Sequence, residues 1–549
     1  MEKERSLFKE PWLWLIFFSY LALAAAGFNR GLLLSDEGYQ MYYSWLMANG
    51  QKIYKDFFLT VAPFAYMVQA ALIKIFGVKL IVSRIYAAIF GIAVFFAISY
   101  ISKKAVPGKY WLLSAGLYII FSNNLFNYSQ HCVMSKYFFV LSLALALYWF
   151  DSGSLIAFFG SGLLAGMAGF SYQSLVAVAG AQMILCLWFK NKNHFRDWLK
   201  PAIAYCAGFL VIAAVVSIYL AKERLLEESL QLLVFGNRKQ HVFVVLFKYI
   251  FPVILAVCLL NFVPIRVRFN KFHSAISAVM QGVFVVLLCT ILANAFENLS
   301  FTTNVLSWML PVALFSAAFG YLSKEKASGG QMLTFYISAL FFPIGLLGGY
   351  DIGHNLSSAL LLIPWIGYLA GKLIKSSPGK ILAESAALPI MLVILVIGLA
   401  TMVIWRWELW GEVEPLYRCN SELKLKTARG IYTSPEQKQE LETLVAYLQK
   451  NTTSQDKILI YPNQLLIYYL AERVSLSKAP FFYYETTDLG ELEKAAALSK
   501  TNKTPVIFQL KNEKIFQPLN SAKAEAIIED LLKSCTKKIE LKNYLVCAL

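Results

Sequence analysis

Charged residues are scarce in this chain of 549 residues: Asp, Glu, Lys and Arg together make up 15% of it, whereas hydrophobic residues make up 58%. Soluble domains carry roughly a quarter charged residues and about half or less apolar residues. The apolar excess lies in many separate runs of about 17 to 24 residues, each long enough to cross a hydrocarbon core of about 30 Å as a helix. The composition therefore excludes a soluble globular protein and indicates a membrane protein with many spans.

Motifs for metals and phosphates are also missing. The chain contains 5 His residues, no CxxC pair and no His, Asp and Glu spacing typical of a dedicated metal cage. No glycine-rich loop that could cradle a phosphate occurs in the tail after about residue 410. The sequence therefore predicts no required metal.

Cysteine is sparse, with 8 residues in total. Five of them lie in or near apolar runs, where a free thiol behaves as a small hydrophobe: Cys132, Cys186, Cys206, Cys258 and Cys289. Cys419, Cys535 and Cys547 lie in the polar tail, so a disulfide is chemically feasible there, and we favour the pair Cys535 and Cys547.

The apolar runs predict about thirteen transmembrane helices. The first begins after a basic flank and is too long for a signal peptide. The runs lie near 11–28, 80–101, 110–122, 134–150, 154–170, 174–189, 201–221, 242–263, 274–293, 305–322, 331–347, 355–374 and 382–405.

Lys and Arg in the short loops set the expected orientation. They gather on one side of alternating spans, at 3–9, 103–109, 190–200, 266–271, 323–326 and 372–380, whereas the opposite short loops at 297–304 and 348–355 have none. This asymmetry predicts a cytoplasmic N-terminus, with the loop after the first span and everything after about residue 406 outside. The net charge of +17 is then explained by chain orientation and contact with anionic headgroups, so we expect no nucleic-acid partner.

The tail, residues 409–549, changes character. A Ser-Pro-Glu start predicts a helix over 434–451, apolar segments at 457–462 and 504–510 predict strands, and 521–534 predicts a second helix. Residues 537–549 alternate and predict a closing strand. We expect a small extracytoplasmic α/β domain that either contacts the acceptor or only covers the outer surface.

Two adjacent acids, Asp36 and Glu37, follow the first span directly. With Ser35 as N-cap they would stand in the first turn of a helix, whose N-terminus stabilises negative charge. Asp36 shares a face with Tyr39 and Tyr43, and Glu37 points about 100° away. The apolar residues of this helix recur at helical spacing and form a stripe, which suits a helix lying on the membrane surface. A second such helix is expected at 61–77. The alternative is that both acids only cap the helix.

The order of these elements carries a resemblance. The chain carries, in this order, a basic N-terminus, the first span, the acid pair, the surface helix, "GQKIYKDF", a proline-containing second helix, "KIFG" and "VSRIYAAIFG". This order resembles the polyprenyl-phosphate-sugar-dependent glycosyltransferases of the type C fold, especially the aminoarabinose-type and protein O-mannosyltransferase-like families. The resemblance implies a mostly α polytopic membrane domain over 1–408. It also implies inverting transfer of one sugar from a polyprenyl phosphate to an acceptor, with Asp36 as general base and Glu37 orienting the site.

The chain departs from those families at three places. Gly38-Tyr39 stands where the aminoarabinose transferases have an arginine, Val61-Ala62-Pro63 replaces their Lys-Pro-Pro, and Ser135 stands near an expected acid. We therefore expect the leaving phosphate to meet Lys136, one residue after Ser135, or the cluster of Arg238, Lys239 and His241. His131, a further candidate, lies one helical turn from Ser135. Their alternative role is anchoring at the membrane interface.

Further candidates for substrate contact are Tyr39, Tyr43, Arg84 and His354. Arg84 matches an arginine of the resembling families, although a structural bond to loop carbonyls is the stronger expectation. Asp351 and His354 lie in a glycine-rich outer loop that could line a sugar pocket. The resemblance leaves room for a divalent cation, Mg²⁺ or Mn²⁺, beside Asp36.

Two other classes compete with this interpretation. A lipid-linked sugar flippase or transporter should show internal repeats, and none is visible here. An oligosaccharide ligase would need a long outer loop between late spans. The sequence thus favours a glycosyltransferase of a bacterial inner membrane that uses a polyprenyl-phosphate sugar and a lipid, glycan or protein acceptor.

Overall fold

The computed structural model describes residues 7–121, 129–190, 195–229, 314–315, 318, 321–322, 327–345, 358–376, 414–482, 489–510 and 522–549. Three predicted spans, 242–263, 274–293 and 382–405, and most of the span at 305–322 lie outside these residues. So do Arg238, Lys239, His241, Asp351 and His354.

The described part of the chain is mostly helical, and its apolar helices match the predicted runs in position. They are α1 (Pro11–Gly27), α4 (Leu80–Ala105), α5 (Trp111–Phe121), α6 (His131–Ser152), α7 (Leu155–Ser171), α8 (Leu175–Lys190), α9 (Leu199–Lys222), α15 (Gly329–Gly345) and α17 (Ile363–Ser376). Among the residues described, three stretches are long and apolar enough to cross a membrane: Leu80–Ala105, His131–Ser152 and Arg196–Lys222. These helices make the chain a membrane protein.

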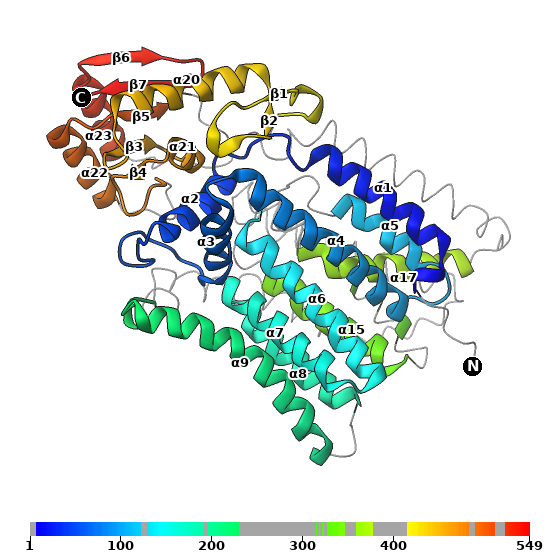
Figure 1. The fold of residues 1–549 in the computed structure, drawn as a ribbon. Coiled ribbons are helices and arrows are strands. Elements are labelled where there is room, and N and C mark those ends of the chain that lie inside the picture. The colour runs from blue at the N-terminus through cyan, green and yellow to red at the C-terminus, as the bar shows by residue number, and fades with distance from the viewer. Residues whose placement is uncertain are drawn as a thin grey trace.

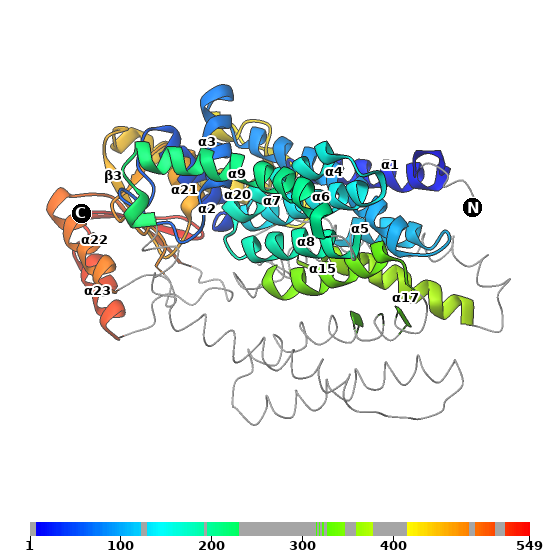
Figure 2. The same cartoon turned by 90° about the horizontal axis from the view of Figure 1, so that it is seen from below.

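Small and polar residues bring these helices together. Gly162 of α7 and Gly208 of α9 face each other's helix so closely that a Cβ at either would overlap the opposite backbone. Gln182 of α8 donates hydrogen bonds to the hydroxyls of Ser142 and Ser161, at 2.8 and 2.9 Å, and thereby links α6, α7 and α8. On the side away from α3, α15 packs on α8 and α17 packs on α5 (Figure 2).

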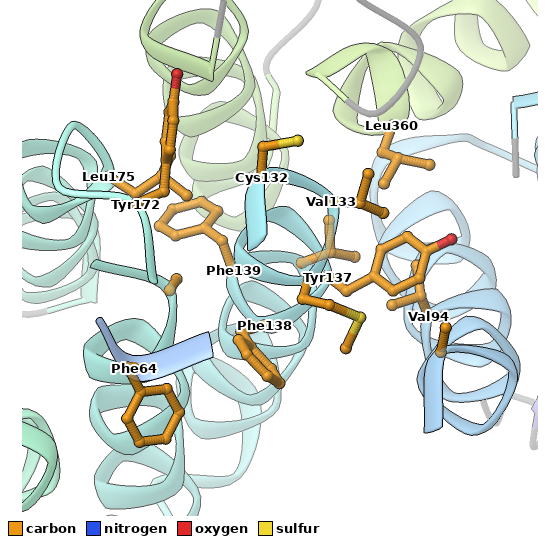
Figure 3. Packing of buried hydrophobic residues seen from close by; sticks show 14 of the residues in the cluster. Phe64, Val94, Cys132, Val133, Tyr137, Phe138, Phe139, Tyr172, Leu175 and Leu360 are labelled. Atoms are coloured by element: carbon orange, nitrogen blue, oxygen red, sulfur yellow. The ribbon is translucent and has the colours of Figure 1, made fainter. Parts of the chain in front are cut away.

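Helix α6 lies at the centre of this bundle and its first half is buried on all sides. Figure 3 shows Tyr137 directed towards Val94 of α4 and Phe138 directed towards Phe64 of α3. The rings of Phe64 and Phe138 are 6.5 Å apart. Because its rings fill the spaces to both neighbours, the start of α6 is held in a fixed position.

Two shorter helices, α2 (Asp36–Ala48) and α3 (Phe64–Phe76), follow the first span as expected. Helix α2 begins at Asp36, but Ser35 makes no side-chain cap hydrogen bond. Ten of the 13 residues of α2 are buried, since α3 covers one side and the C-terminal region covers another. Helix α2 is therefore an enclosed helix rather than one lying open on the membrane surface.

The C-terminal region contains a two-stranded sheet and a five-stranded sheet. The short sheet pairs β1 (Ser421–Glu422) with β2 (Tyr432–Thr433). The larger sheet has the order β4-β3-β5-β7-β6, in which β3 runs parallel to β4 and β5, and β7 runs antiparallel to β5 and β6. Its strands are β3 (Lys457–Tyr461), β4 (Val474–Ser475), β5 (Val506–Gln509), β6 (Lys537–Glu540) and β7 (Tyr544–Ala548).

The helices described beside these sheets are α20 (Pro435–Asn451), α21 (Leu465–Ala471), α22 (Leu489–Asn502) and α23 (Ala522–Lys533). Strands β3 and β5 and helices α20 and α23 lie where the sequence predicts them. The prediction of one closing strand was wrong, because residues 541–543 turn the chain and make a hairpin of β6 and β7. Cys535 and Cys547 form the favoured disulfide, which joins the end of α23 to β7.

The C-terminal region sits at the same end of the helical bundle as α2 and α3, away from the N-terminus (Figure 1). Segments from the two ends of the chain therefore meet around α2.

Candidate active site

The two adjacent acids have different surroundings. Glu37 is 1% exposed and Arg84, in the first turns of α4, is 3% exposed. Arg84 donates to both carboxylate oxygens of Glu37, from Nε at 2.8 Å and from Nη2 at 2.7 Å. A bidentate charge pair of this kind is strong and fixes both side chains. Asp36, by contrast, is partly exposed.

Arg84 also holds the loop between α1 and α2. It donates to the backbone carbonyl of Gly31 at 2.7 Å and to that of Phe28 at 3.4 Å. These bonds are the structural ones expected from the sequence. Arg84 thus ties the end of α1, the start of α2 and the start of α4 together.

One face of α2 is the docking surface for the C-terminal region. A Cβ at Gly38 would overlap the backbone of Leu465 and Leu466 in α21, so only glycine permits this approach. The backbone N–H of Leu466 donates to the carbonyl of Leu34 at 3.0 Å. One turn after Gly38, the hydroxyl of Tyr42 accepts a hydrogen bond from the N–H of Ser475 at 2.7 Å.

Further backbone bonds extend this docking. Gly31 donates to the carbonyl of Tyr432, and Tyr432 donates to the carbonyl of Asn29, each at 2.8 Å. Phe58, in the loop after α2, donates to the carbonyl of Lys478 at 2.8 Å. The glycine at position 38 and these bonds make a closely packed, hydrogen-bonded interface between α2 and the C-terminal region.

Buried tyrosines line the same interface. The rings of Tyr42 and Tyr468 stack at 5.0 Å. Burial raises the pKa of Tyr469, and the negative charges of Glu37 and Glu472 raise that pKa further. Tyr469 therefore stays a neutral phenol next to the Glu37 carboxylate.

The other face of α2 gathers aromatic rings behind Asp36. Tyr39 packs edge-on against Tyr43 at 4.6 Å and against Phe481 of the C-terminal region at 5.5 Å. Tyr43 is fully buried and stacks on Phe57 at 5.0 Å. The C-terminal region thus reaches the residue one turn beyond Asp36.

Helices α3 and α6 complete this cluster. The hydroxyl of Tyr66 lies 2.9 Å from Nδ1 of His131, and the ring of His131 lies 6.0 Å from that of Tyr39. The backbone N–H of His131 donates to Oε1 of Gln40 at 3.0 Å. Sequence reasoning singled out His131, Tyr39 and Tyr43, and the fold brings them together; it missed Gln40, Tyr66 and Phe481.

Lys136 stands five residues after His131 on α6, which places it about 140° around the helix axis. It is fully buried and engaged with other groups of the protein. The hydroxyl of Ser135 donates to the carbonyl of Cys132 at 2.8 Å, within its own helix turn. Ser135 therefore serves the helix backbone.

Within the described residues, no group of three or more His, Cys, Asp or Glu side chains is arranged to hold a metal ion. Both oxygens of Glu37 are bonded to Arg84, whereas Asp36 is the partly exposed acid of the pair. The arrangement provides a partly exposed carboxylate beside an aromatic cluster and a histidine.

No protein-family model matches the chain. No curated protein matches its sequence.

Solved structures do match. ArnT from Cupriavidus metallidurans bound to undecaprenyl phosphate is 10% identical and covers 98% of each chain, with a TM-score of 0.53. The archaeal oligosaccharyltransferase AglB from Archaeoglobus fulgidus, in complex with an inhibitory peptide and a dolichol-phosphate, is 12% identical. That match covers 92% of this chain and 70% of AglB, with a TM-score of 0.48. On the full-length match to ArnT, the chain has the fold of the type C glycosyltransferases.

Proposed function

We propose that the protein is a membrane glycosyltransferase that moves one sugar from a polyprenyl-phosphate donor to an acceptor, with inversion at the anomeric carbon. The observation that carries the proposal is the position of Asp36. It is the partly exposed member of an acid pair at the start of α2, next to the cluster of Tyr39, Tyr66 and His131. The fold shared with ArnT, a protein solved with undecaprenyl phosphate, supports the choice of donor.

In the proposed reaction an acceptor hydroxyl attacks the anomeric carbon as the bond to the polyprenyl phosphate breaks. Asp36 takes the hydroxyl proton, and the polyprenyl phosphate leaves with the electron pair of the glycosidic bond. Because a carboxylate is a modest base, proton removal must be concerted with attack, and positioning supplies much of the acceleration. Glu37 acts indirectly, since its pair with Arg84 fixes the first turn of α2 that carries Asp36.

The leaving phosphate requires positive charge. We propose Lys136, Arg238 or Lys239 for this role, with His354 at the sugar. A divalent cation at Asp36 is not required in this proposal, so EDTA treatment of the purified protein should leave transfer unchanged.

We propose a topology of about thirteen spans, with the N-terminus in the cytoplasm of a bacterial cell, domain 1–408 in the inner membrane and domain 409–549 outside. The disulfide Cys535–Cys547 supports the outside location, because disulfides persist in oxidising compartments. A reporter fused after Leu549 that is active only outside the cytoplasm tests this arrangement. Activity of a cytoplasm-only reporter at the same position would contradict it.

The test of the reaction is transfer of radiolabelled sugar from defined polyprenyl-phosphate donors to a membrane extract. Asp36→Asn should lower transfer about a hundredfold or more, the scale of a lost general base. The matched control is Asp530→Asn, on the exposed face of α23, which removes the same charge far from the site and should transfer as the wild type does. Undiminished transfer by Asp36→Asn would make Asp36 a helix cap, and no transfer with any donor would favour a flippase.

A further inference from the structure

Two polar groups on the site-facing side of α2 have no partner among the described residues: Nε2 of Gln40 and the hydroxyl of Tyr43. Gln40 is 1% exposed and Tyr43 is 0% exposed. Buried polar groups are nearly always hydrogen-bonded, because leaving one unpaired is unfavourable. The hydroxyl of Tyr469 in α21 has the same unused hydrogen-bonding capacity, so it is the place of Gln40 and Tyr43 on the Asp36 side of α2 that points to a ligand.

The orientation of the Gln40 amide is fixed by its neighbour. The backbone N–H of His131 can only donate, so the atom 3.0 Å away must be the amide oxygen of Gln40. The NH₂ group consequently faces away from His131 and offers two N–H donors. Gln40 and Tyr43 are three positions apart on α2, and side chains at this spacing are neighbours on a helix.

The surroundings indicate the chemistry of the ligand. Tyr43 packs against the rings of Tyr39, Phe57 and Tyr66, at 4.6, 5.0 and 6.3 Å. The surroundings of Tyr43 are thus neutral rings, with Tyr42 also at 5.8 Å, and Gln40 adds an amide from the same side of α2. A charged phosphate requires cationic partners. A sugar hydroxyl both donates and accepts hydrogen bonds, so it matches the amide of Gln40 and the phenol of Tyr43 together.

We propose that Gln40 and Tyr43 form a subsite that binds a hydroxyl group of the transferred sugar and so helps to select it. This inference rests on the proposed function. Gln40 lies one helical turn and Tyr43 two turns beyond Asp36 on the same side of α2, so the subsite would hold the sugar next to the general base. Neither residue takes part in bond making; each positions and discriminates.

The test compares two ligands for each protein variant. Purified protein in detergent micelles is titrated with polyprenyl phosphate and with a panel of polyprenyl-phosphate pentoses and hexoses. Tyr43→Phe removes one oxygen and keeps the ring, and it should raise Kd for the sugar-bearing lipid that the wild type prefers about tenfold. Its Kd for the bare lipid should stay within about twofold. Gln40→Met should behave in the same way.

A matched control is Tyr469→Phe. Tyr469 is also a buried tyrosine whose hydroxyl has no partner in the described part of the chain, but it lies in α21. This variant should bind both lipids as the wild type does. Lipids that carry monodeoxy sugars sharpen the comparison. One of them should bind the wild type about tenfold more weakly than the parent sugar lipid does. The same derivative should bind Tyr43→Phe as tightly as the parent sugar lipid does.

Three outcomes overturn the subsite. The first is an equal rise in Kd for the sugar-bearing lipid and the bare lipid. The second is an unchanged Kd for both lipids in Tyr43→Phe and Gln40→Met. The third is a wild type that binds no sugar-bearing lipid more tightly than bare lipid. The last outcome would also remove the donor class proposed above. If binding follows the expected pattern while no sugar is transferred to any acceptor, the subsite stands and the proposed reaction fails.

Discussion

The two faces of α2 differ in how completely their polar groups are satisfied. On the docking face, Glu37 is bonded through both oxygens, Tyr42 accepts from Ser475, and Gly38 lets α21 pack directly on the helix. On the site face, Asp36 is partly exposed. Nε2 of Gln40 and the hydroxyl of Tyr43 are buried and have no hydrogen-bond partner among the described residues.

This difference separates structural from functional side chains on a single helix of 13 residues. A face that is fully paired contributes stability, whereas unpaired buried groups are retained where a ligand or water completes them. The comparison leads to predictions for three substitutions on the docking face. Each should change the free energy of unfolding much more than the rate of sugar transfer.

The largest effect is expected from Glu37→Gln. It leaves the buried Arg84 guanidinium without its counter-ion, which should lower the free energy of unfolding by about 3 kcal/mol. Chemical denaturation in detergent micelles measures this change. Arg84→Met and the double variant complete a cycle, in which the two single losses should not add. Additive losses would show that the pair is not coupled.

Gly38→Ala comes next. The new Cβ overlaps the backbone of α21, so the C-terminal region must shift, and the free energy of unfolding should fall by about 2 kcal/mol. Gly180→Ala in α8 is the matched control, because nothing lies within 4 Å of a Cβ there and alanine should stabilise the helix by about 0.5 kcal/mol or more. Equal effects of the two substitutions would contradict close packing at Gly38.

The smallest effect is expected from Tyr42→Phe. It removes the acceptor of the Ser475 N–H, and the loss should be about 1 kcal/mol. Tyr469→Phe removes a buried hydroxyl that has no partner among the residues described, so thermal unfolding should occur at the same temperature or slightly higher. A larger loss for Tyr469→Phe than for Tyr42→Phe would reverse the comparison.

Local pattern was enough to predict several parts of this arrangement. The Ser-Asp-Glu sequence predicted the start of α2 at Asp36, and the apolar runs predicted α1 and the helices from α4 to α9. The loop-carbonyl bonds of Arg84 were also expected. Each of these features depends on residues close in sequence or on the hydropathy of one segment.

Contacts between distant segments were not predictable in this way. Tyr42 and Ser475 are 433 positions apart, and the sequence around Gly38 does not indicate that α21 packs on it. Gln40 looked like an ordinary polar helix residue, because its role depends on the start of α6. Tyr66 is a phenol in an apolar helix, which is only a weak signal, and its hydrogen bond with His131 depends on the packing of α3 against α6.

The most direct test of the separation of the two faces is to measure sugar transfer and unfolding for Asp36→Asn and Glu37→Gln side by side. We predict that Asp36→Asn unfolds as the wild type does and loses transfer about a hundredfold or more. Glu37→Gln should unfold far more easily, and its remaining folded fraction should transfer sugar better than Asp36→Asn does. Full transfer by a stably folded Asp36→Asn protein would contradict the account.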